Sequence, residues 1–498
     1  MRQLLLGLDI GSSSIKASIV DAATGKSISS SQSPSEEMGM IAHHAGWAEQ
    51  EPEMWWGHLV ISVKSSIKKA KADPDEIVAI GISYQMHGLV VVDKDHNSLR
   101  PSVIWCDSRA VEIGQRACDS LGGNYCLEHF LNSPGNFTAS KLKWVRDNEP
   151  SLYAKIHKFM LPGDYIAMKL SGDIVTTDTG LSEGIFWDYQ TQTVSDRLMD
   201  HYGFDEKLLP PIVPVFGLQG TVNKQAAAAL GIRPGVKICY RAGDQPNNAF
   251  SLNVLNPGET AATAGTSGVI YSVTQKNAFD TKSRVNTFIH VNNRHDNPSN
   301  GVLLCVNGTG ILNSWLRKNT GTAGSLPDYD QMNAQAAEVP VGSEGLIILP
   351  FGNGAERVLE NRNVNASIAG LDFNHHTQAH IFRAAQEGIV FALKYGFDVL
   401  QEMGLATSVI RAGNANMFLS PVFREAFVNT ISAPLELYNT DGATGAAIGA
   451  GVGAGIFDST ETAFKGLKTI RVDKPQRELT DKYQEAYSKW KSQLNNIL

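Results

Sequence analysis

The sequence lacks the features of membrane, secreted and zinc-binding proteins. No run of about 18 apolar residues occurs, so no membrane-spanning helix is expected. The chain has five cysteines and no C-x-x-C pair, a pattern that predicts neither a disulfide framework nor a zinc site. Leu4-Leu5-Leu6 is followed by Asp9 before it reaches the length of a signal-peptide core. We therefore expect a cytoplasmic protein.

A surplus of basic charge is also missing. The net charge is −7, and charged residues make up 19% of the chain, below the roughly 25% of an average globular protein. Neither value favours a nucleic acid or an anionic membrane as partner, because both require a basic face. The histidine pairs at 43–44 and 375–376 have no acidic or thiol neighbour at ligand spacing. Both pairs are predicted to lie at the surface rather than to bind a metal.

The hydrophobic pattern predicts an α/β fold in two similar halves. Apolar runs bounded by turn residues indicate buried strands at 3–10, 15–20, 77–84, 345–350 and 408–412. Residues 259–274 again read as strand, turn and strand, and a long helix is expected from about Thr377 to Met403, where Gly404 ends it.

The length predicts more than one domain, because 498 residues exceed the roughly 100–200 of a typical domain. We place the boundary just after the segment Gly243–Phe250. The predicted domains are residues 1–250 and 251–498.

The segment Asp9–Lys16 places a carboxylate before a small polar turn. The turn consists of glycine and three serines: Gly11, Ser12, Ser13 and Ser14. Backbone N–H groups and hydroxyls in such a turn can hold phosphate oxygens. Asp9 is a candidate ligand for Mg²⁺, which needs only one or two protein carboxylates, and Lys16 would offset phosphate charge. An ordinary polar hairpin has the same pattern, so this segment alone leaves both interpretations open.

The second half carries a matching turn at Gly265-Thr266-Ser267-Gly268. No Walker A loop and no strand-linked G-x-G-x-x-G offers another phosphate site. The paired turns resemble the phosphate-binding hairpins of the sugar kinase, Hsp70 and actin superfamily. That resemblance implies a ribonuclease H-like superfold with a duplicated core and an interdomain cleft.

Asp244 is the candidate catalytic residue. It follows Ala242 and Gly243 at the end of a predicted strand, and small residues there let a ligand approach the backbone closely. A carboxylate so placed can accept the proton of a sugar hydroxyl while the oxygen attacks phosphorus. The alternative is an Asx turn before Pro246, without a catalytic role.

With these segments together, the chain resembles the FGGY family of carbohydrate kinases from its first strand to about Gly455. Residues 136–148 and 366–387 resemble the two family signatures, with Asn136 and Gln386 as departures. The resemblance implies ATP as phosphoryl donor, Mg²⁺ as its metal, a small sugar as acceptor and a homodimer. It implies catalytic roles for Asp244 and Asp9, with Asp9 also the metal ligand.

The resemblance is strongest to the xylulokinase branch of that family. Gln85-Met86-His87-Gly88 matches its sugar-binding motif, in which Met and His lie against a ketose. Trp105 and Asp107 resemble its W-x-D element, and Gln245 follows the catalytic aspartate. The implied reaction is the ATP-dependent phosphorylation of D-xylulose to D-xylulose 5-phosphate, with all five of these side chains contacting the sugar: Met86, His87, Trp105, Asp107 and Gln245.

Two departures from the branch affect the details. Gln245 stands where xylulokinases commonly have asparagine, and it resembles the glycerol kinase branch. Residues 412–416 read AGNAN in place of the usual glycine-rich adenine loop, with Gly413 and Asn416 as the remaining candidate contacts. Gly310 is a further candidate for the nucleotide.

Two other functions remain open at this point. A sibling kinase for ribulose, another ketose or a polyol would use the same catalytic groups. A non-catalytic, ATP-driven binding or chaperone-type protein would share the fold, but it would have no use for Asp244 or for the sugar motif at 85–88.

Overall fold

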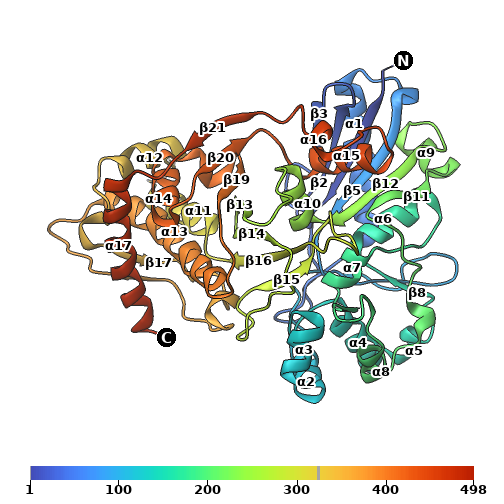
Figure 1. The fold of residues 1–498 in the computed structure, drawn as a ribbon, viewed down its shortest axis with the longest axis horizontal. Coiled ribbons are helices and arrows are strands. Elements are labelled where there is room, and N and C mark those ends of the chain that lie inside the picture. The colour runs from blue at the N-terminus through green and yellow to red at the C-terminus, as the bar shows by residue number, and fades with distance from the viewer. Residues whose placement is uncertain (1, 322–325) are drawn as a thin grey trace. The chain divides into compact units, whose positions relative to one another are not determined.

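The computed structural model describes residues 2–321 and 326–498, which form two compact units. Unit 1 contains the chain up to Asn253 together with Phe288–Asn300 and Thr440–Leu467. Unit 2 contains Val254–Thr287, Gly301–Asn439 and Lys468–Leu498. Figure 1 follows the chain from blue to red through both units. Each unit has its own mixed sheet with helices packed on it, which confirms the predicted α/β class.

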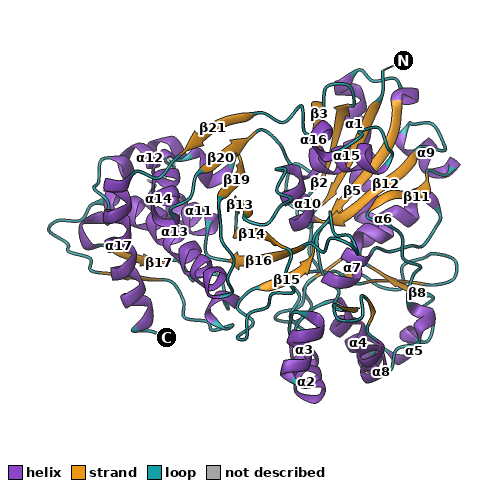
Figure 2. Cartoon of the chain, viewed as in Figure 1, coloured by secondary structure: helices purple, strands orange, loops and turns teal. Residues whose placement is uncertain are grey.

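The sheet of unit 1 has the strand order β11-β12-β5-β1-β2-β3. An antiparallel hairpin pairs β1 with β2, and β5 and β12 continue the sheet in parallel with β1. Figure 2 shows these strands side by side. Because β1, β5 and β12 run in the same direction, their carboxyl ends meet at one edge of the sheet. The strands are β1 (Leu4–Ile10), β2 (Ile15–Asp21), β3 (Lys26–Ser33), β5 (Ile77–Tyr84), β11 (Phe216–Thr221) and β12 (Lys237–Gly243).

Opposite faces of this sheet are covered by helices α1 (Pro52–Ala70) and α15 (Gly442–Gly453). Leu4, Leu6 and Leu8 pack with Trp55 and Leu59 of α1, as the two-residue period of a strand requires. The opposite face is nearly flat at Gly7 and Gly81, because glycine has no side chain. A Cβ atom would lie 1.8 Å from the carbonyl oxygen of Ala443 at Gly7 and 1.9 Å from that of Ala446 at Gly81. The backbone of α15 therefore lies directly on β1 and β5.

The sheet of unit 2 repeats the hairpin-plus-parallel-strand arrangement. Its order is β15-β16-β14-β13-β19-β20-β21, with β13 antiparallel to β14 and parallel to β19. The strands are β13 (Glu259–Ala264), β14 (Gly268–Thr274), β15 (Asn286–Ile289), β16 (Asn300–Val306), β19 (Val409–Gly413), β20 (Leu435–Tyr438) and β21 (Thr469–Asp473).

The core of unit 2 forms around helix α13 (Gln378–Glu402), which matches the long helix expected from the sequence. Ile389 and Leu393 of α13 belong to one apolar cluster with Phe423 of α14 (Pro421–Ile431) and Trp490 of α17 (Arg477–Asn495). The Trp490 indole also donates a 2.9 Å hydrogen bond to the carbonyl of Ile348.

Shorter elements complete both units, and no helix in the described ranges is long and apolar enough to cross a membrane. The further helices are α2 (Val111–Leu121), α3 (Gly123–Phe130), α4 (Thr138–Asn148), α5 (Pro150–Tyr153), α6 (Pro162–Ser171), α7 (Asp178–Glu183), α8 (Asp196–Tyr202), α9 (Lys224–Leu230), α10 (Asp244–Ser251), α11 (Gly310–Thr320), α12 (Tyr329–Ala337) and α16 (Thr460–Ala463). The further strands are β4 (Glu49–Gln50), β6 (Val90–Val92), β7 (Ser102–Val103), β8 (Lys158–Met160), β9 (Trp187–Asp188), β10 (Thr193–Val194), β17 (Ile347–Leu349) and β18 (Ser367–Ala369).

Candidate functional site

The β1–β2 hairpin of unit 1 is a tight polar turn held in place from outside. Its closing hydrogen bond runs from the Gly11 N–H to the carbonyl of Ser14 at 3.1 Å. The Gln50 side chain donates to the Ser12 carbonyl at 2.7 Å, and the Trp105 indole donates to the Ser12 hydroxyl at 3.2 Å. Ser13 remains exposed. The turn is therefore preorganised while its outer surface stays open to a ligand.

Asp9 lies beside this turn, at the end of β1. Its Oδ1 accepts a 2.9 Å hydrogen bond from the Ser83 hydroxyl of β5, and Lys16 is its cross-strand neighbour on β2. Burial raises the pKa of Asp9, Lys16 and Ser83 lower it, and the negative charge of Asp441 raises it further. A Cβ at Gly442 would lie 2.7 Å from Oδ2 of Asp9. Close approach of the α15 N-terminus is thus possible only because residue 442 is glycine.

Asp244 begins helix α10 directly after β12. In the sheet, Gly243 is paired with Tyr84 of β5, and Tyr84 is also paired with Ile10 of β1, so Asp244 and Asp9 lie at the same strand edge. Burial and the negative charge of Asp9 raise the pKa of Asp244 to about 7, against the opposing effect of hydrogen bonds with Gln245. A carboxylate with a pKa near neutral pH is well matched to general base catalysis.

The sugar motif continues from the end of β5 at the same edge. The Met86 side chain is 4% exposed and packs on Gly243, where a Cβ would lie 2.6 Å from its Cγ. His87 has a left-handed backbone, with φ of 62°, a conformation that a non-glycine residue adopts only when its surroundings hold it. Met86, His87 and Asp244 are therefore brought together, as the sequence motifs predict for a common site.

Two buried ionisable residues hold His87 in this conformation. The carboxylate of Glu183, in α7, accepts the His87 backbone N–H at 3.2 Å, and its carbonyl oxygen lies 2.9 Å from Nδ1 of the ring. Because a carbonyl can only accept, the ring proton is on Nδ1. Lys141, in α4, donates to the His87 carbonyl at 2.9 Å. The side chains of Glu183 and Lys141 are 2% and 0% exposed.

Glu183 and Lys141 were not singled out by the sequence reasoning. Burial raises the pKa of Glu183 well above its ordinary value and lowers that of Lys141 to about 8. The nearby Tyr84 hydroxyl acts against this rise in the pKa of Glu183. Within the described residues, neither that hydroxyl nor Oε1 of Glu183 meets the distance and angle limits of a hydrogen bond. Both residues lie on helices far along the chain from residue 87, so no local pattern connects them with it.

Trp105 and Asp107 differ in their access to a ligand. Trp105 is 49% exposed beside the hairpin. Asp107 is 0% exposed; its carboxylate accepts the Ala48 N–H at 2.6 Å and pairs with Arg109 at 2.7 Å. The Arg109 guanidinium in turn stacks 3.8 Å from the Trp47 ring centroid. These contacts fix the loop that presents Trp105, and the predicted sugar contact of Asp107 stays a prediction.

In unit 2, the β13–β14 hairpin is joined to the start of α11. The Gly310 and Ile311 N–H groups donate to the carbonyls of Gly265 and Thr266 at 2.9 and 3.1 Å. A Cβ at Gly310 would lie 2.3 Å from the Gly265 carbonyl oxygen, so only glycine permits this contact. A cavity of about 480 Å³ opens beside the hairpin. Its lining includes four predicted nucleotide residues: Gly265, Thr266, Gly310 and Asn416.

Gly413 does not line this cavity; it ends β19 and its carbonyl accepts the Ala415 N–H at 2.9 Å. The loop then reaches Asn416, which has a left-handed backbone with φ of 54°. Asparagine tolerates this conformation better than most residues. The structure therefore gives Gly413 a place in the turn that carries Asn416 to the cavity.

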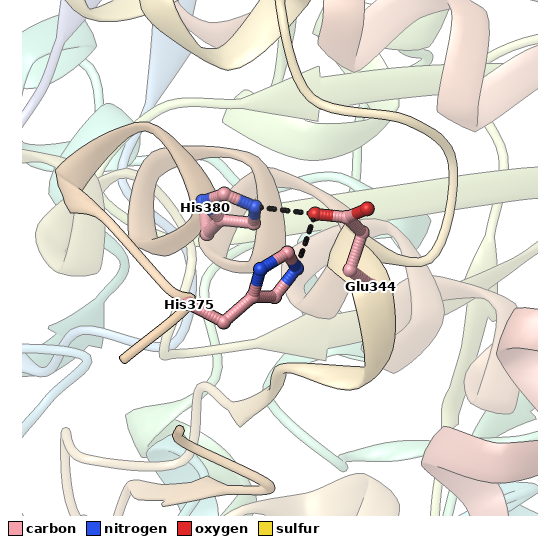
Figure 3. Close-up of side chains that lie close together, drawn as sticks. All are labelled: Glu344, His375 and His380. Atoms are coloured by element: carbon pink, nitrogen blue, oxygen red, sulfur yellow. Dashed lines mark hydrogen bonds and ion pairs between the residues drawn. The ribbon is translucent and has the colours of Figure 1, made fainter. Parts of the chain in front are cut away.

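A histidine–carboxylate cluster lies elsewhere in unit 2, and Figure 3 shows its three side chains pointing at one another. Nε2 of His375 and Nε2 of His380 lie 2.7 and 2.8 Å from the same oxygen of Glu344. The Thr377 N–H donates to Nδ1 of His380 at 3.1 Å, so the proton of that ring is on Nε2. A metal ion would need the lone pair of that nitrogen. The contacts are those of a cap that ties the Glu344 turn to the start of α13.

The comparisons with known proteins identify the family of the chain. The model of the FGGY family of carbohydrate kinases, N-terminal domain, matches residues 4–251, and that of its C-terminal domain matches residues 260–454. The xylulose kinase of Haemophilus influenzae is 31% identical over 418 residues, which cover 82% of each chain.

Solved structures show the same fold at lower identity. The ligand-bound xylulose kinase of Lactobacillus acidophilus has a TM-score of 0.89 at 22% identity, covering 99% of this chain and 98% of that one. The glycerol kinase of Plasmodium falciparum with ADP has a TM-score of 0.87 at 20% identity, covering 100% and 98%.

Proposed function

This chain belongs to the FGGY family of carbohydrate kinases, and from that premise we propose that it transfers the γ-phosphoryl group of ATP to O5 of D-xylulose. The observation that carries the proposal is the position of Asp244, whose pKa is raised to about 7, beside Met86 and His87 at one edge of the unit 1 sheet. The names of the curated relatives support D-xylulose as the acceptor.

In the proposed reaction Asp244 accepts the proton of the sugar hydroxyl. The hydroxyl oxygen bonds to the γ-phosphorus, and the bond between that phosphorus and the bridging oxygen of the β-phosphate breaks. His87 and Met86 hold the acceptor, with Gln245 and Trp105 as further contacts. The Gly11–Ser14 turn and Lys16 offer N–H groups, hydroxyls and a positive charge to phosphate oxygens. The Gly265–Thr266 turn, with Gly310 and Asn416, takes the nucleotide in the unit 2 cavity.

Asp9 suits a magnesium ion by its chemistry, because it is a carboxylate and its second oxygen lies beside Gly442, which has no side chain. Mg²⁺ takes oxygen ligands and keeps several waters, so one carboxylate is a sufficient protein contribution. When bound, the ion would offset the charge of the phosphate groups. Asp9 itself is held in place by Ser83.

The test is an ADP-release assay with D-xylulose, L-xylulose, D- and L-ribulose, D-fructose, glycerol and no sugar. We expect a clear preference for D-xylulose and a turnover at least ~10²-fold lower in Asp244→Asn, with ADP affinity unchanged. Preference for another acceptor would transfer the proposal to a sibling kinase and focus attention on Gln245. ADP release independent of any sugar would favour the chaperone-type alternative.

A further inference from the structure

Gln386 is a polar residue in the interior of unit 2. It lies in the middle of α13, its side chain is 1% exposed, and both ends of its amide are hydrogen-bonded. Its Nε2 donates to Oδ1 of Asn333 in α12 at 3.0 Å, and its Oε1 accepts from the Ser420 hydroxyl at 2.7 Å. Loss of either partner would leave a buried amide group without a hydrogen bond, which costs free energy of folding. The three side chains therefore form one connected hydrogen-bond relay.

The relay has a direction that begins at the start of α14. The Phe423 N–H donates to the Ser420 hydroxyl at 3.3 Å, as expected of an N-cap serine. The Ser420 O–H then points to Oε1 of Gln386, which directs Nε2 toward Asn333. Since Oδ1 of Asn333 receives this hydrogen bond, its amide nitrogen is the end that remains to donate elsewhere.

Asn333 and Ser420 both line the cavity of about 480 Å³ that also contains Gly265, Gly310 and Asn416. Without a fixed partner, an asparagine can turn its amide and offer either a donor or an acceptor. With Gln386 in place, Asn333 offers the cavity N–H donors. An apolar side chain at 386 would fill the same interior without imposing this orientation.

We propose that Asn333, oriented by Gln386 and Ser420, is a specificity residue that donates a hydrogen bond to an acceptor ring nitrogen of the purine base. The inference rests on the proposed function, in which this cavity takes the nucleotide. It assigns the chain a base-reading contact outside the hairpin and the 412–416 loop, made by a residue that the sequence motifs did not include.

The test is a calorimetric binding cycle with ADP and its 1-deaza, 3-deaza and 7-deaza analogues, measured on wild type and Asn333→Ala. We expect one analogue to bind wild type about three- to tenfold more weakly than ADP, the range of one hydrogen bond. Asn333→Ala should bind ADP with a similar loss and should no longer distinguish that analogue from ADP. If each analogue is weaker than ADP by the same factor in wild type and in Asn333→Ala, the proposal is overturned.

The orienting role of Gln386 is tested with Gln386→Leu, against Gln401→Leu as a control on an exposed position of the same helix. Gln386→Leu should show a smaller difference between ADP and the sensitive analogue, while the KM for the sugar stays the same; Gln401→Leu should match wild type. Undiminished discrimination in folded Gln386→Leu would remove Gln386 from the role. Should that variant fail to fold, the Asn333→Ala cycle still decides the proposal. ADP binding without sugar phosphorylation would reject the proposed function and leave this cycle valid.

Discussion

At the scale of single residues, the catalytic role proposed for Asp244 comes with a cost in stability. Its folded-state pKa is raised to about 7, mainly by burial, from an ordinary value of 3.8. The folded protein keeps a proton that the unfolded chain releases between these values, so the free energy of unfolding falls as the pH rises from about 4 to about 7. Above that window the carboxylate is charged in both states and the penalty is constant.

Asp244→Asn removes this titration, so we expect its thermal unfolding temperature to exceed that of wild type at about pH 8. At about pH 4 both side chains are neutral in the folded state, and the difference should shrink toward zero. Calorimetry of both proteins across this range measures the effect. A pH-independent difference would mean that the asparagine acts through packing and that Asp244 is not the group with the raised pKa.

A second residue-scale prediction concerns Glu183, which accepts the His87 N–H. Glu183→Leu removes the acceptor, so His87 should leave its left-handed conformation and the KM for the sugar should rise about tenfold. Glu183→Gln keeps an oxygen acceptor and should stay within about threefold of wild type. The KM for ATP should change in neither. Steady-state kinetics would contradict the prediction if both KM values rose together, and Glu112→Leu, at a position 89% exposed, is the control.

At the scale of elements, the contact between α15 and the unit 1 sheet depends on missing side chains. Gly81→Ala would place a Cβ 1.9 Å from the Ala446 carbonyl oxygen, which forces the helix off the strand. We expect a loss of unfolding free energy of about 1–3 kcal/mol or more. Gly57→Ala, on an exposed position of α1 with no atom within 4 Å of the new Cβ, should instead stabilise by about 0.5–1 kcal/mol.

Denaturant unfolding of both variants measures the effect of the same substitution, glycine to alanine, at a packed position and at an exposed one. A Gly81→Ala protein as stable as wild type would show that α15 can shift without loss. Activity is a second readout, because Gly442 at the start of the same helix lies against Asp9. Displacement of α15 should therefore also lower turnover.

At the scale of the whole molecule, the sequence predicted what depends on local pattern. Apolar runs bounded by turn residues predicted β1, β2 and β5, and Gly404 predicted the end of α13, because these signals lie within a few residues of the feature. The paired hairpins and the small residues before Asp244 likewise predicted a turn at each of these places, and that ligands bind there stays a prediction. Contacts between distant segments were missed: Lys141 and Glu183 around His87, Glu344 beside His375, and Asn333 behind Gln386. Each of these contacts joins residues far apart in the chain, so no local sequence pattern indicates it before the fold is known.

The last prediction concerns unit 1, because one face of its sheet is covered by a helix from a segment near the far end of the chain. Helix α15 belongs to Thr440–Leu467, yet it covers β1 and β5 through Gly7 and Gly81. A fragment of residues 1–253 would leave that face to water and should not unfold cooperatively. The same fragment joined to residues 440–467 by a flexible Gly/Ser linker should do so, as circular dichroism on heating would detect. Both proteins omit Phe288–Asn300, so that segment cannot explain a difference between them. Ala446→Glu in the joined segment should abolish the gain, because Ala446 is 0% exposed against the sheet. Equal cooperative unfolding with and without residues 440–467 would show instead that the N-terminal sheet is stable without α15.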